Sequence, residues 1–374
     1  MKKLKVLQVN KMYYPVIGGV EKVVQQIAEG LKEQTDMEVL VCNQKGRSSD
    51  ERINHVRVIR TSSLGVYFSM PVSVSFLFKL RKMAGEKDIL LFHMPFPLGD
   101  LAGLLSGYKG KVVVWWHSDI VKQKKLLKLY EPLMKRFLKR ADKIIVATEG
   151  HIEHSAYLGA FKEKCVVIPY GVDASITEDS RRYTQETKDS KEVTFLFVGR
   201  LVYYKGCEVL LRAFSKLNRG RLILAGSGPL KEDLLKITKE AGIADKVIFV
   251  EKPSDEKLKE LYKECDVFVL PSVEKTEAFG LVQIEAMSYG KPVINTRLKS
   301  GVPYVGKDGV TGITVEPKDS EALYLAMKKL AENSELRLEM GRNAYSMVQE
   351  KYLMQNMLNQ TLDLLEEVVF NDNI

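Results

Sequence analysis

The 374-residue sequence has few of the residues that mark small secreted or metal-binding proteins. Its four cysteines form no Cys-x-x-Cys pair, so we expect core thiols in a reducing compartment, not a redox pair or a zinc knuckle. There is no Asp-x-Asp motif, and only His151 and His154 have a metal-ligand spacing. No window approaches about 18 uncharged apolar residues, and the apolar stretch at the start is too short for a secretory leader. These absences predict metal-independent chemistry in a cytoplasmic chain.

Acidic residues are scarce in the first part of the chain. Residues 1–170 contain 28 Lys and Arg against 16 Asp and Glu, a net charge of +12, whereas residues 171–374 contain 29 against 32, a net charge of −3. A basic half indicates an anionic partner, such as a nucleic acid, a phospholipid surface or a phosphorylated acceptor.

The sequence is rich in α/β alternation. Short apolar, β-branched runs alternate with amphipathic stretches of helix length, a pattern typical of parallel sheets buried on both faces. We expect two doubly wound, Rossmann-like parallel-sheet domains facing a central cleft, with ligands at the carboxyl ends of the strands. The predicted strands are residues 5–9, 38–42, 55–59, 89–92, 112–116, 143–147 and 165–168, then 194–198, 222–225, 247–250, 267–270, 292–295 and 313–315.

The polar segment 173–191, nearly free of large aliphatic residues, is predicted to be an interdomain linker. The expected domains are residues 1–172 and 192–351. Residues 352–374 repeat apolar residues at helical spacing and predict a final helix.

Two glycines, Gly18 and Gly19, lie between the first predicted strand and a predicted helix. Glycine lets the backbone approach a ligand, and a helix N-terminus offers free N–H groups to a phosphate. The alternative is a tight turn that needs a positive φ angle, because the full dinucleotide fingerprint is absent.

The first loop of the second half contains Arg200 and Lys205 between two glycines. A guanidinium fork and an ammonium group together suit a diphosphate, although a pair of solvated surface charges is the simpler alternative.

Two carboxylates, Glu277 and Glu285, flank the next predicted strand-to-helix loop. Glu277 precedes the turn at Phe279 and Gly280, and Glu285 lies in the early turns of a helix that begins near Leu281. They can contact one elongated ligand at separate points, while the free amides at the helix start meet an anion.

Glu277-x7-Glu285, in the context Pro-Ser-x4-Glu-Ala-Phe-Gly-Leu-Val-x-x-Glu-Ala-Met, resembles the hallmark of the family 4 retaining glycosyltransferases, which have the GT-B fold. The resemblance covers most of the chain. It continues through Gly18-Gly19, Gly199-Arg200 with Lys205-Gly206, the string at residues 225–229 and the string at residues 308–312.

This resemblance implies a donor site for a nucleoside-diphosphate sugar. Arg200 and Lys205 would hold the diphosphate, Glu285 the ribose hydroxyls and Glu277 the hydroxyls of the transferred sugar. The backbone of Phe279, Gly280, Leu281 and Val282 would hold sugar and phosphate, and Gly18 and Gly19 would close over the diphosphate from the other domain. Such enzymes usually have a glycine where this chain has Glu251, in a loop that lies against the nucleobase, so the base stays open.

His117 and Asp119 follow a buried strand in the first half, where a histidine can bind a sugar hydroxyl or cap the next helix. The run from His117 to Lys124 resembles a signature of members that build O-antigen and exopolysaccharide chains, often from GDP-mannose. Residues 298–303 point the same way. We therefore expect transfer of a hexose, with mannose favoured, from a GDP-sugar or alternatively a UDP-sugar, with no permanently bound cofactor. His93, after another strand, would border the acceptor channel or lie in a structural turn.

Residues 121–140 are basic, and Leu126, Leu129, Leu133 and Phe137 recur at helical spacing. Such a helix can lie on anionic headgroups, or can be an ordinary domain helix with a solvated basic side. Because related enzymes commonly use lipid-linked acceptors, we expect a saccharide or lipid-linked saccharide acceptor and docking on the cytoplasmic face of the membrane. In this fold the last helix commonly crosses back onto the first domain.

Transfer with retention implies attack from the leaving-group face, so no general base is assigned. The candidate catalytic residues are Glu277, His117, Arg200 and Lys205. The rivals are a nucleotide-sugar epimerase or glycogen-type synthase of the same fold, a nucleic-acid-binding module and a dehydrogenase. Most aromatic residues lie in strand runs or apolar helix faces, which disfavours nucleic acid as the partner, and Gly18-Gly19 lacks the nicotinamide fingerprint.

Overall fold

The computed structural model describes residues 3–16, 18–67, 70–120, 124–173 and 192–370, which form two compact units. Unit 1 comprises Met1–Ile168 and Met357–Ile374, and unit 2 comprises Pro169–Asn356. Nearly all of the predicted linker lies outside the described residues. The unit boundary lies four residues before the predicted one at Val172, because the backbone of Val172 pairs with Tyr352 and Met354.

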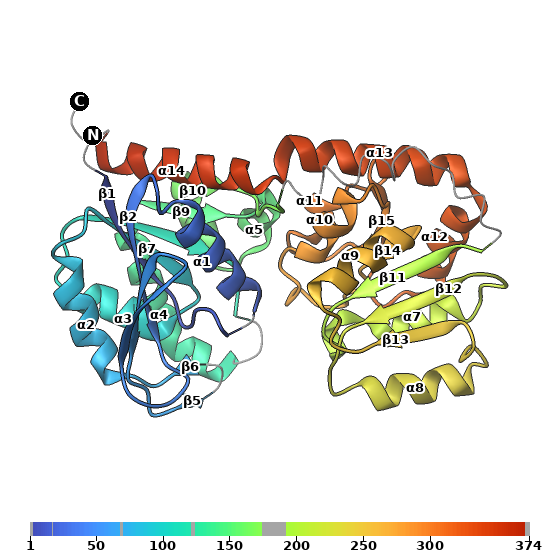
Figure 1. The fold of residues 1–374 in the computed structure, drawn as a ribbon, viewed down its shortest axis with the longest axis horizontal. Coiled ribbons are helices and arrows are strands. Elements are labelled where there is room, and N and C mark those ends of the chain that lie inside the picture. The colour runs from blue at the N-terminus through green and yellow to red at the C-terminus, as the bar shows by residue number, and fades with distance from the viewer. Residues whose placement is uncertain (1–2, 17, 68–69, 121–123, 174–191, 371–374) are drawn as a thin grey trace. The chain divides into compact units, whose positions relative to one another are not determined.

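Unit 1 is built on an eight-stranded sheet with the strand order β10-β9-β8-β7-β1-β2-β4-β3 (Figure 1). All neighbouring pairs are parallel except β3 and β4. The strands are β1 (Leu4–Val9), β2 (Thr35–Cys42), β3 (Ser49–Ile53), β4 (Val56–Thr61), β7 (Ile89–Met94), β8 (Lys111–Trp116), β9 (Lys143–Val146) and β10 (Cys165–Val167); β5 (Val66–Tyr67) and β6 (Met70–Pro71) form a small antiparallel pair.

The helices of unit 1 cover both faces of this sheet. Helices α2, α3 and α4 pack on one face, where Phe92 and Phe137 meet edge to face at 4.7 Å between ring centroids. Burying each such side chain contributes about 1.5–3 kcal/mol. The side chain of Leu358 in α14 lies against Gly30 in α1. The helices are α1 (Gly19–Gly30), α2 (Val74–Ala84), α3 (Pro97–Leu105), α4 (Lys124–Arg140), α5 (Glu149–His154), the 3₁₀ helix η1 (Leu158–Lys164) and α14 (Met354–Phe370), whose first three residues belong to unit 2.

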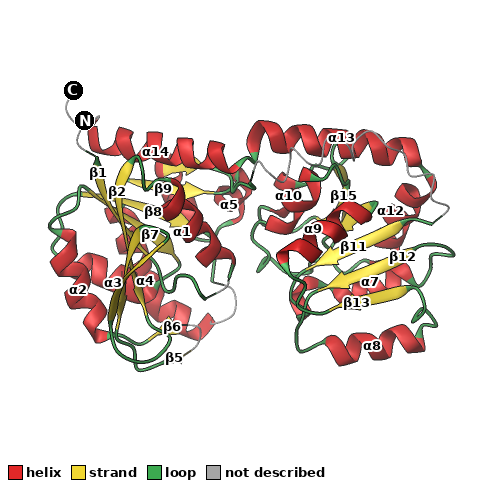
Figure 2. Ribbon diagram, viewed as in Figure 1, coloured by secondary structure: helices red, strands yellow, loops and turns green. Residues whose placement is uncertain are grey.

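Unit 2 is built on a six-stranded parallel sheet with the order β13-β12-β11-β14-β15-β16 (Figure 2). Its strands are β11 (Thr194–Val198), β12 (Arg221–Ala225), β13 (Val247–Val250), β14 (Val267–Val269), β15 (Val293–Thr296) and β16 (Gly312–Val315). Its helices are η3 (Tyr203–Lys205), α7 (Cys207–Phe214), α8 (Lys231–Glu240), α9 (Asp255–Glu264), α10 (Leu281–Ser288), α11 (Val302–Val305), α12 (Ser320–Glu332) and α13 (Ser334–Lys351).

The predicted fold class, two doubly wound α/β sheets, is confirmed, and the predicted strands lie within two or three residues of those observed. The sequence did not reveal the antiparallel strand β3, which is polar and exposed and so looks like a loop. Asn54 and His55 link β3 to β4 with φ angles of 48° and 73°, the conformation of a tight hairpin turn. His55 therefore lies in that turn and not in the strand predicted to begin there.

Three of the four cysteines are buried thiols, as predicted, and Cys165 is half-buried. None of the helices in the described part of the chain combines the length and the apolar character needed to cross a bilayer.

Candidate functional site

The candidate donor site of unit 2 lies where its strand order reverses. Strands β11 and β14 are neighbours, and the sheet grows outward from them in opposite directions, which is where doubly wound sheets bind ligands at the carboxyl ends of the strands. The loops that follow these two strands contain the predicted residues, and they are joined because Val273 N–H donates to Tyr204 C=O at 2.8 Å.

Two of the predicted catalytic residues meet at this point. Lys205 Nζ forms an ion pair with Glu277 Oε2, and each side chain is only 11% exposed. The same oxygen accepts a hydrogen bond from Ser272 Oγ at 3.1 Å. Lys205 and Glu277 thus form a buried ion pair at the carboxyl ends of β11 and β14.

Glycine is required where the two loops touch. Gly206 has a φ of +70°, and a Cβ on it would lie 2.0 Å from the carbonyl oxygen of Pro271. Gly280, which precedes α10, has a φ of +75°. Both positions therefore combine the left-handed backbone with close packing, so a side chain fits neither.

The start of α10 presents backbone donors. The N–H groups of Phe279, Gly280, Leu281 and Val282 have no hydrogen-bond acceptor among the residues that the structure describes. Such groups at a helix N-terminus form an anion site. The Phe279 ring itself is buried and packs edge-on against Tyr170, with 4.8 Å between centroids, so only its backbone is available to a ligand.

A buried amide network, which the sequence analysis missed, holds this turn in place. Gln283 Nε2 donates to Phe279 C=O at 3.0 Å, and Gln283 Oε1 accepts from Asn295 Nδ2 at 2.8 Å. Asn295 also donates to Gly306 C=O at 2.9 Å and accepts from Thr314 Oγ1 at 2.8 Å. The signal in the sequence was two amide side chains in otherwise apolar segments.

The two remaining donor-site predictions lie in different surroundings. Glu285 is half-buried and accepts a hydrogen bond from the hydroxyl of Tyr262 at 2.8 Å. Tyr262 is buried and stacks on Tyr289 at 5.7 Å between centroids. Arg200 is exposed, and its side chain makes no hydrogen bond or ion pair with any described residue.

The strand order of unit 1 reverses between β1 and β7, and the predicted histidines lie there. His93 Nε2 lies 2.8 Å from Gln8 Oε1, and His93 Nδ1 lies 2.9 Å from His117 Nε2. We call these three buried side chains the Gln8–His93–His117 array. Both ring nitrogens of His93 contact other side chains of the protein. Neither is therefore left to bind an acceptor sugar, the role that the sequence suggested for His93.

Burial keeps these histidines neutral. Desolvation lowers the pKa of His93 from its ordinary value of 6.5 to about 3. It also lowers the pKa of His117 well below that value, and the neighbouring His93, His151 and Lys11 add to the effect. The imidazole of His117 can thus accept a hydrogen bond, which an imidazolium cannot.

The structure gives Asp119 a structural role and gives Gly18 an extended backbone. Asp119 accepts hydrogen bonds from Ser155 Oγ at 2.7 Å and from Ala156 N–H at 3.0 Å, so it holds the end of α5. Gly18 is extended, with a φ of −169°, and Gly19 begins α1. Neither glycine has a positive φ, so the tight-turn explanation is wrong for this pair.

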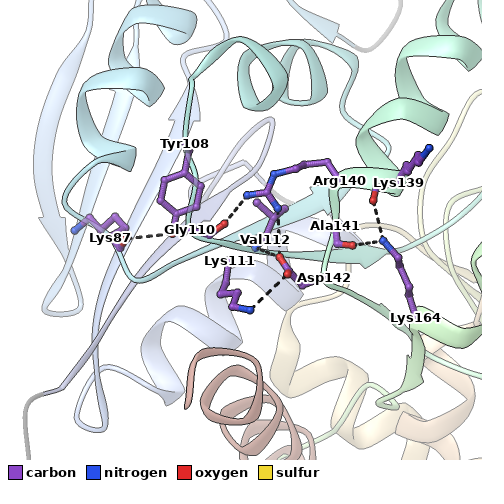
Figure 3. Close-up of polar contacts among 10 residues, drawn as sticks. All are labelled: Lys87, Tyr108, Gly110, Lys111, Val112, Lys139, Arg140, Ala141, Asp142 and Lys164. Carbon is purple, nitrogen blue, oxygen red and sulfur yellow. Dashed lines mark hydrogen bonds and ion pairs between the residues drawn. The ribbon is translucent and has the colours of Figure 1, made fainter. Parts of the chain in front are cut away.

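Helix α4 is the described part of the basic segment 121–140, since residues 121–123 lie outside the described ones. Phe137 is buried, whereas Leu129 is 83% exposed, so Leu129 does not pack into the core with the rest of the predicted apolar stripe that the structure describes. Arg140 at its end is held by Gly110 C=O and by Asp142 Oδ2, which also accepts from Val112 N–H at 2.8 Å (Figure 3). Among the α4 side chains that the structure describes, the exposed cations are Lys128, Lys135, Arg136 and Lys139.

Known proteins resemble this chain over nearly its full length. Residues 17–176 match the family described as Glycosyltransferase Family 4, and residues 179–347 match Glycosyl transferases group 1. The chain is 32% identical to O-antigen chain mannosyltransferase C of Escherichia coli, over 96% of this chain and 98% of that protein. It is 34% identical to D-rhamnosyltransferase WbpZ of Pseudomonas aeruginosa, over 91% and 90% respectively.

Among solved structures, Alr3699/HepE of Anabaena, in complex with UDP, superposes with a TM-score of 0.78. The match covers 97% of this chain and 100% of that chain at 19% identity, and it shows the same fold.

Proposed function

Because the chain belongs to the family 4 glycosyltransferases with the GT-B fold, as the sequence predicted, we propose that it is a retaining, metal-independent hexosyltransferase. Its donor is a nucleoside-diphosphate sugar, and its acceptor is a saccharide or lipid-linked saccharide in the synthesis of a cell-surface polysaccharide. Relatives named for mannosyl and rhamnosyl transfer favour a GDP-hexose such as GDP-mannose. The UDP complex of the structural neighbour keeps a UDP-sugar as the alternative.

The observation that carries this proposal is the meeting of Lys205, Glu277 and the N-terminal amides of α10 at the β11–β14 switch point. Lys205 and the amides stabilise the negative charge that develops on the leaving diphosphate. Glu277 binds hydroxyls of the transferred sugar, and Arg200, which is exposed, reaches the diphosphate from the solvent side. Glu285, oriented by Tyr262, binds the ribose.

The donor prediction is tested by thermal melting of the full chain with GDP, UDP, ADP and their sugar conjugates, with EDTA present. A ligand at 100 times its Kd stabilises the native state by about 2.7 kcal/mol, or about 5–10 °C for a unit of this size. A shift with GDP and GDP-mannose alone supports the favoured donor. A shift with UDP-sugars alone identifies a UDP-sugar as the donor in place of GDP-mannose. The absence of a shift with every nucleotide contradicts the proposed site.

The catalytic role of Glu277 needs a variant that respects its buried pairing. Glu277→Ala leaves the Lys205 ammonium buried without a partner, which costs about 3–5 kcal/mol and confounds a loss of activity with a loss of fold. Glu277→Gln keeps an oxygen for Lys205 and Ser272. Because it keeps the hydrogen bonds and loses only the counter-charge, we expect it to be destabilised less than Glu277→Ala and, measured below its melting temperature, to transfer sugar about a hundredfold more slowly. Near-normal turnover excludes Glu277 from the reaction.

The exposed cations of α4 support our proposal that unit 1 docks on an anionic membrane. Replacing Lys128, Arg136 and Lys139 by serine should reduce sedimentation with anionic vesicles at low salt. The matched control replaces the exposed Lys236, Lys239 and Lys259 of unit 2 by serine. Equal loss in both triple variants points to net charge alone and contradicts docking through α4.

A further inference from the structure

Exposed apolar side chains gather in one short segment of unit 1. Leu64 is 72% exposed and Phe78 is 70% exposed, although both side chains are large and apolar. The other exposed large apolar side chains of the described residues lie far apart in the sequence, which is normal for a protein surface. We call the exposed side chains of the segment the apolar patch; they are Leu64, Val66, Tyr67, Val72, Val74 and Phe78.

Hydrogen bonds hold the two parts of the apolar patch together. Strands β5 and β6 form an antiparallel hairpin, which Leu64 N–H extends by donating to Val72 C=O at 3.0 Å. Ser62 Oγ and Ser75 Oγ lie 2.8 Å apart and join the start of this hairpin to the first turn of α2. The hairpin and the start of α2 therefore lie next to each other.

Helix α2 exposes an apolar row that continues into cations. Val74, Phe78 and Lys82 recur every four residues, so they lie on one side of the helix. The helix has no acidic residue, and Arg81 is exposed beside Lys82 at its end. An apolar row that leads into cations suits the headgroup boundary of a bilayer. The opposite side of the helix is buried against the sheet and consists of Phe76, Leu80, Met83 and Ala84.

A hollow of about 470 Å³ lies beside Phe78. Lys79 and Lys82 line it, and neither side chain forms a hydrogen bond or an ion pair with any described residue. Asp50 also lines it, but Arg57 holds this carboxylate through two hydrogen bonds of 3.0 and 2.7 Å. Two uncommitted cations beside a paired acid suit a phosphate group. The hydroxyl side chains of the hollow are Ser48, Ser49, Thr61 and Ser75.

The character of the apolar patch favours lipid over saccharide. Aliphatic side chains such as Leu64 and Val74 gain free energy by leaving water, but they offer no hydrogen bond to a sugar hydroxyl. The cations beside them attract an anionic surface. Helices α2 and α4 pack on the same face of the sheet, and their exposed side chains point away from it, so one lipid surface can meet both.

We propose that the apolar patch inserts into the headgroup region of an anionic membrane, with the phosphate of a lipid headgroup in the hollow beside Phe78. The patch adds an apolar anchor to the electrostatic docking proposed for α4. The choice of a membrane as the partner rests on the proposed function, whose lipid-linked acceptor lies in one. A second copy of this chain is the alternative occupant of the patch.

Sedimentation of the full chain with phosphatidylglycerol–phosphatidylcholine vesicles tests the anchor. At high salt, which screens surface charges, we expect the wild type to keep part of its binding. The double variant Leu64→Ser/Phe78→Ser should bind about tenfold more weakly at low salt and lose its binding at high salt. The matched control, Leu325→Ser/Phe370→Ser, removes the same two residue types from other exposed positions and should bind like the wild type. Equal loss in both double variants, or no binding by the wild type, overturns the proposal.

The fold of these variants and the depth of the patch are measured separately. Both double variants should melt like the wild type, because every replaced side chain is exposed. Phe78→Trp should be quenched by vesicles with brominated acyl chains, whereas Leu325→Trp should not. Trp115 and Trp116 are buried and give both proteins the same background. A bound Phe78→Trp protein without quenching refutes insertion.

The hollow is tested by Lys79→Ser/Lys82→Ser, with Lys236→Ser/Lys239→Ser of α8 as the control of equal charge. We expect the first pair to lose most of its preference for anionic over neutral vesicles and the control to keep it. Equal loss in both pairs shows an effect of net charge and overturns the headgroup assignment.

Light scattering tests the alternative occupant. If the wild type is a dimer and Leu64→Ser/Phe78→Ser is a monomer, the patch is an interface between copies and the proposal fails. The nucleotide-dependent melting described above uses unit 2 and no lipid. A failure of the membrane anchor is therefore distinguishable from a failure of the proposed transferase function.

Discussion

Replacing Gly206 by alanine should destabilise unit 2 and damage the donor site together. Alanine at a φ of +70° costs about 1–2 kcal/mol in backbone strain. Its Cβ would also lie 2.0 Å from the carbonyl oxygen of Pro271, and forcing the two loops apart costs about 1–3 kcal/mol more. The expected loss is about 2–5 kcal/mol, or roughly 4–20 °C in melting temperature for a unit of this size.

Gly242 is the matched control for this experiment. It has a φ of +66°, but a Cβ on it would meet nothing within 4 Å. Gly242→Ala therefore measures the backbone strain alone, about 1–2 kcal/mol. Thermal melting of both variants, with and without nucleotide, isolates the contact between the loops. Equal destabilisation of the two variants, or an unchanged nucleotide shift in Gly206→Ala, refutes the claim that this contact shapes the site.

Three further predictions follow from buried polar groups. Tyr262→Phe removes the hydroxyl that donates to Glu285 and should raise KM for the nucleotide sugar about two- to twelvefold with little change in kcat, as a loss of about 0.5–1.5 kcal/mol implies. Burial raises the pKa of Asp100, so the native state holds a proton on this carboxyl that the unfolded chain releases above about pH 4. The stability of the native state therefore falls as the pH rises above that value. Asp100→Asn should therefore raise the melting temperature at pH 8 more than at pH 5. Burial lowers the pKa of His93 to about 3 and that of His151 to about 4, so the unfolded chain binds protons below pH 6.5 that the native rings do not. Each ring should cost about 2 kcal/mol of stability between pH 7.5 and pH 5, and His93→Gln should flatten that fall in a pH series of melting curves.

Much of the fold could be predicted because its strands are apolar on successive positions and its loops carry distinctive residues. The β11–α7 loop shows the limit of this reasoning. Gly199, Arg200 and Lys205 mark a phosphate-binding loop, but nothing in their spacing says that Lys205 pairs with a carboxylate more than 70 residues further along the chain. The topology brings them together, because β14 joins the sheet beside β11.

The side chains that support the site could not be predicted for the same reason. Gln8 lies in a mostly apolar strand and Gln283 in a mostly apolar helix, and each looks like a tolerated polar residue until its partner is known. The partner of Gln8 is 85 residues away, and Asn295, the partner of Gln283, lies on another strand. Edge strand β3 was missed for the opposite reason, since its charged residues suit an exposed edge as well as they suit a loop.

The two switch points use different electrostatics, and the difference fits the proposed reaction. In unit 2, Lys205 and the α10 amides supply positive charge, which a leaving diphosphate needs because its negative charge grows as the bond to the sugar breaks. In unit 1, the histidines are buried and neutral, which suits a hydroxyl that stays uncharged. An imidazolium at position 117 would donate from both nitrogens, whereas a neutral ring donates from one and accepts at the other. Burial disfavours the imidazolium, so His117 stays neutral.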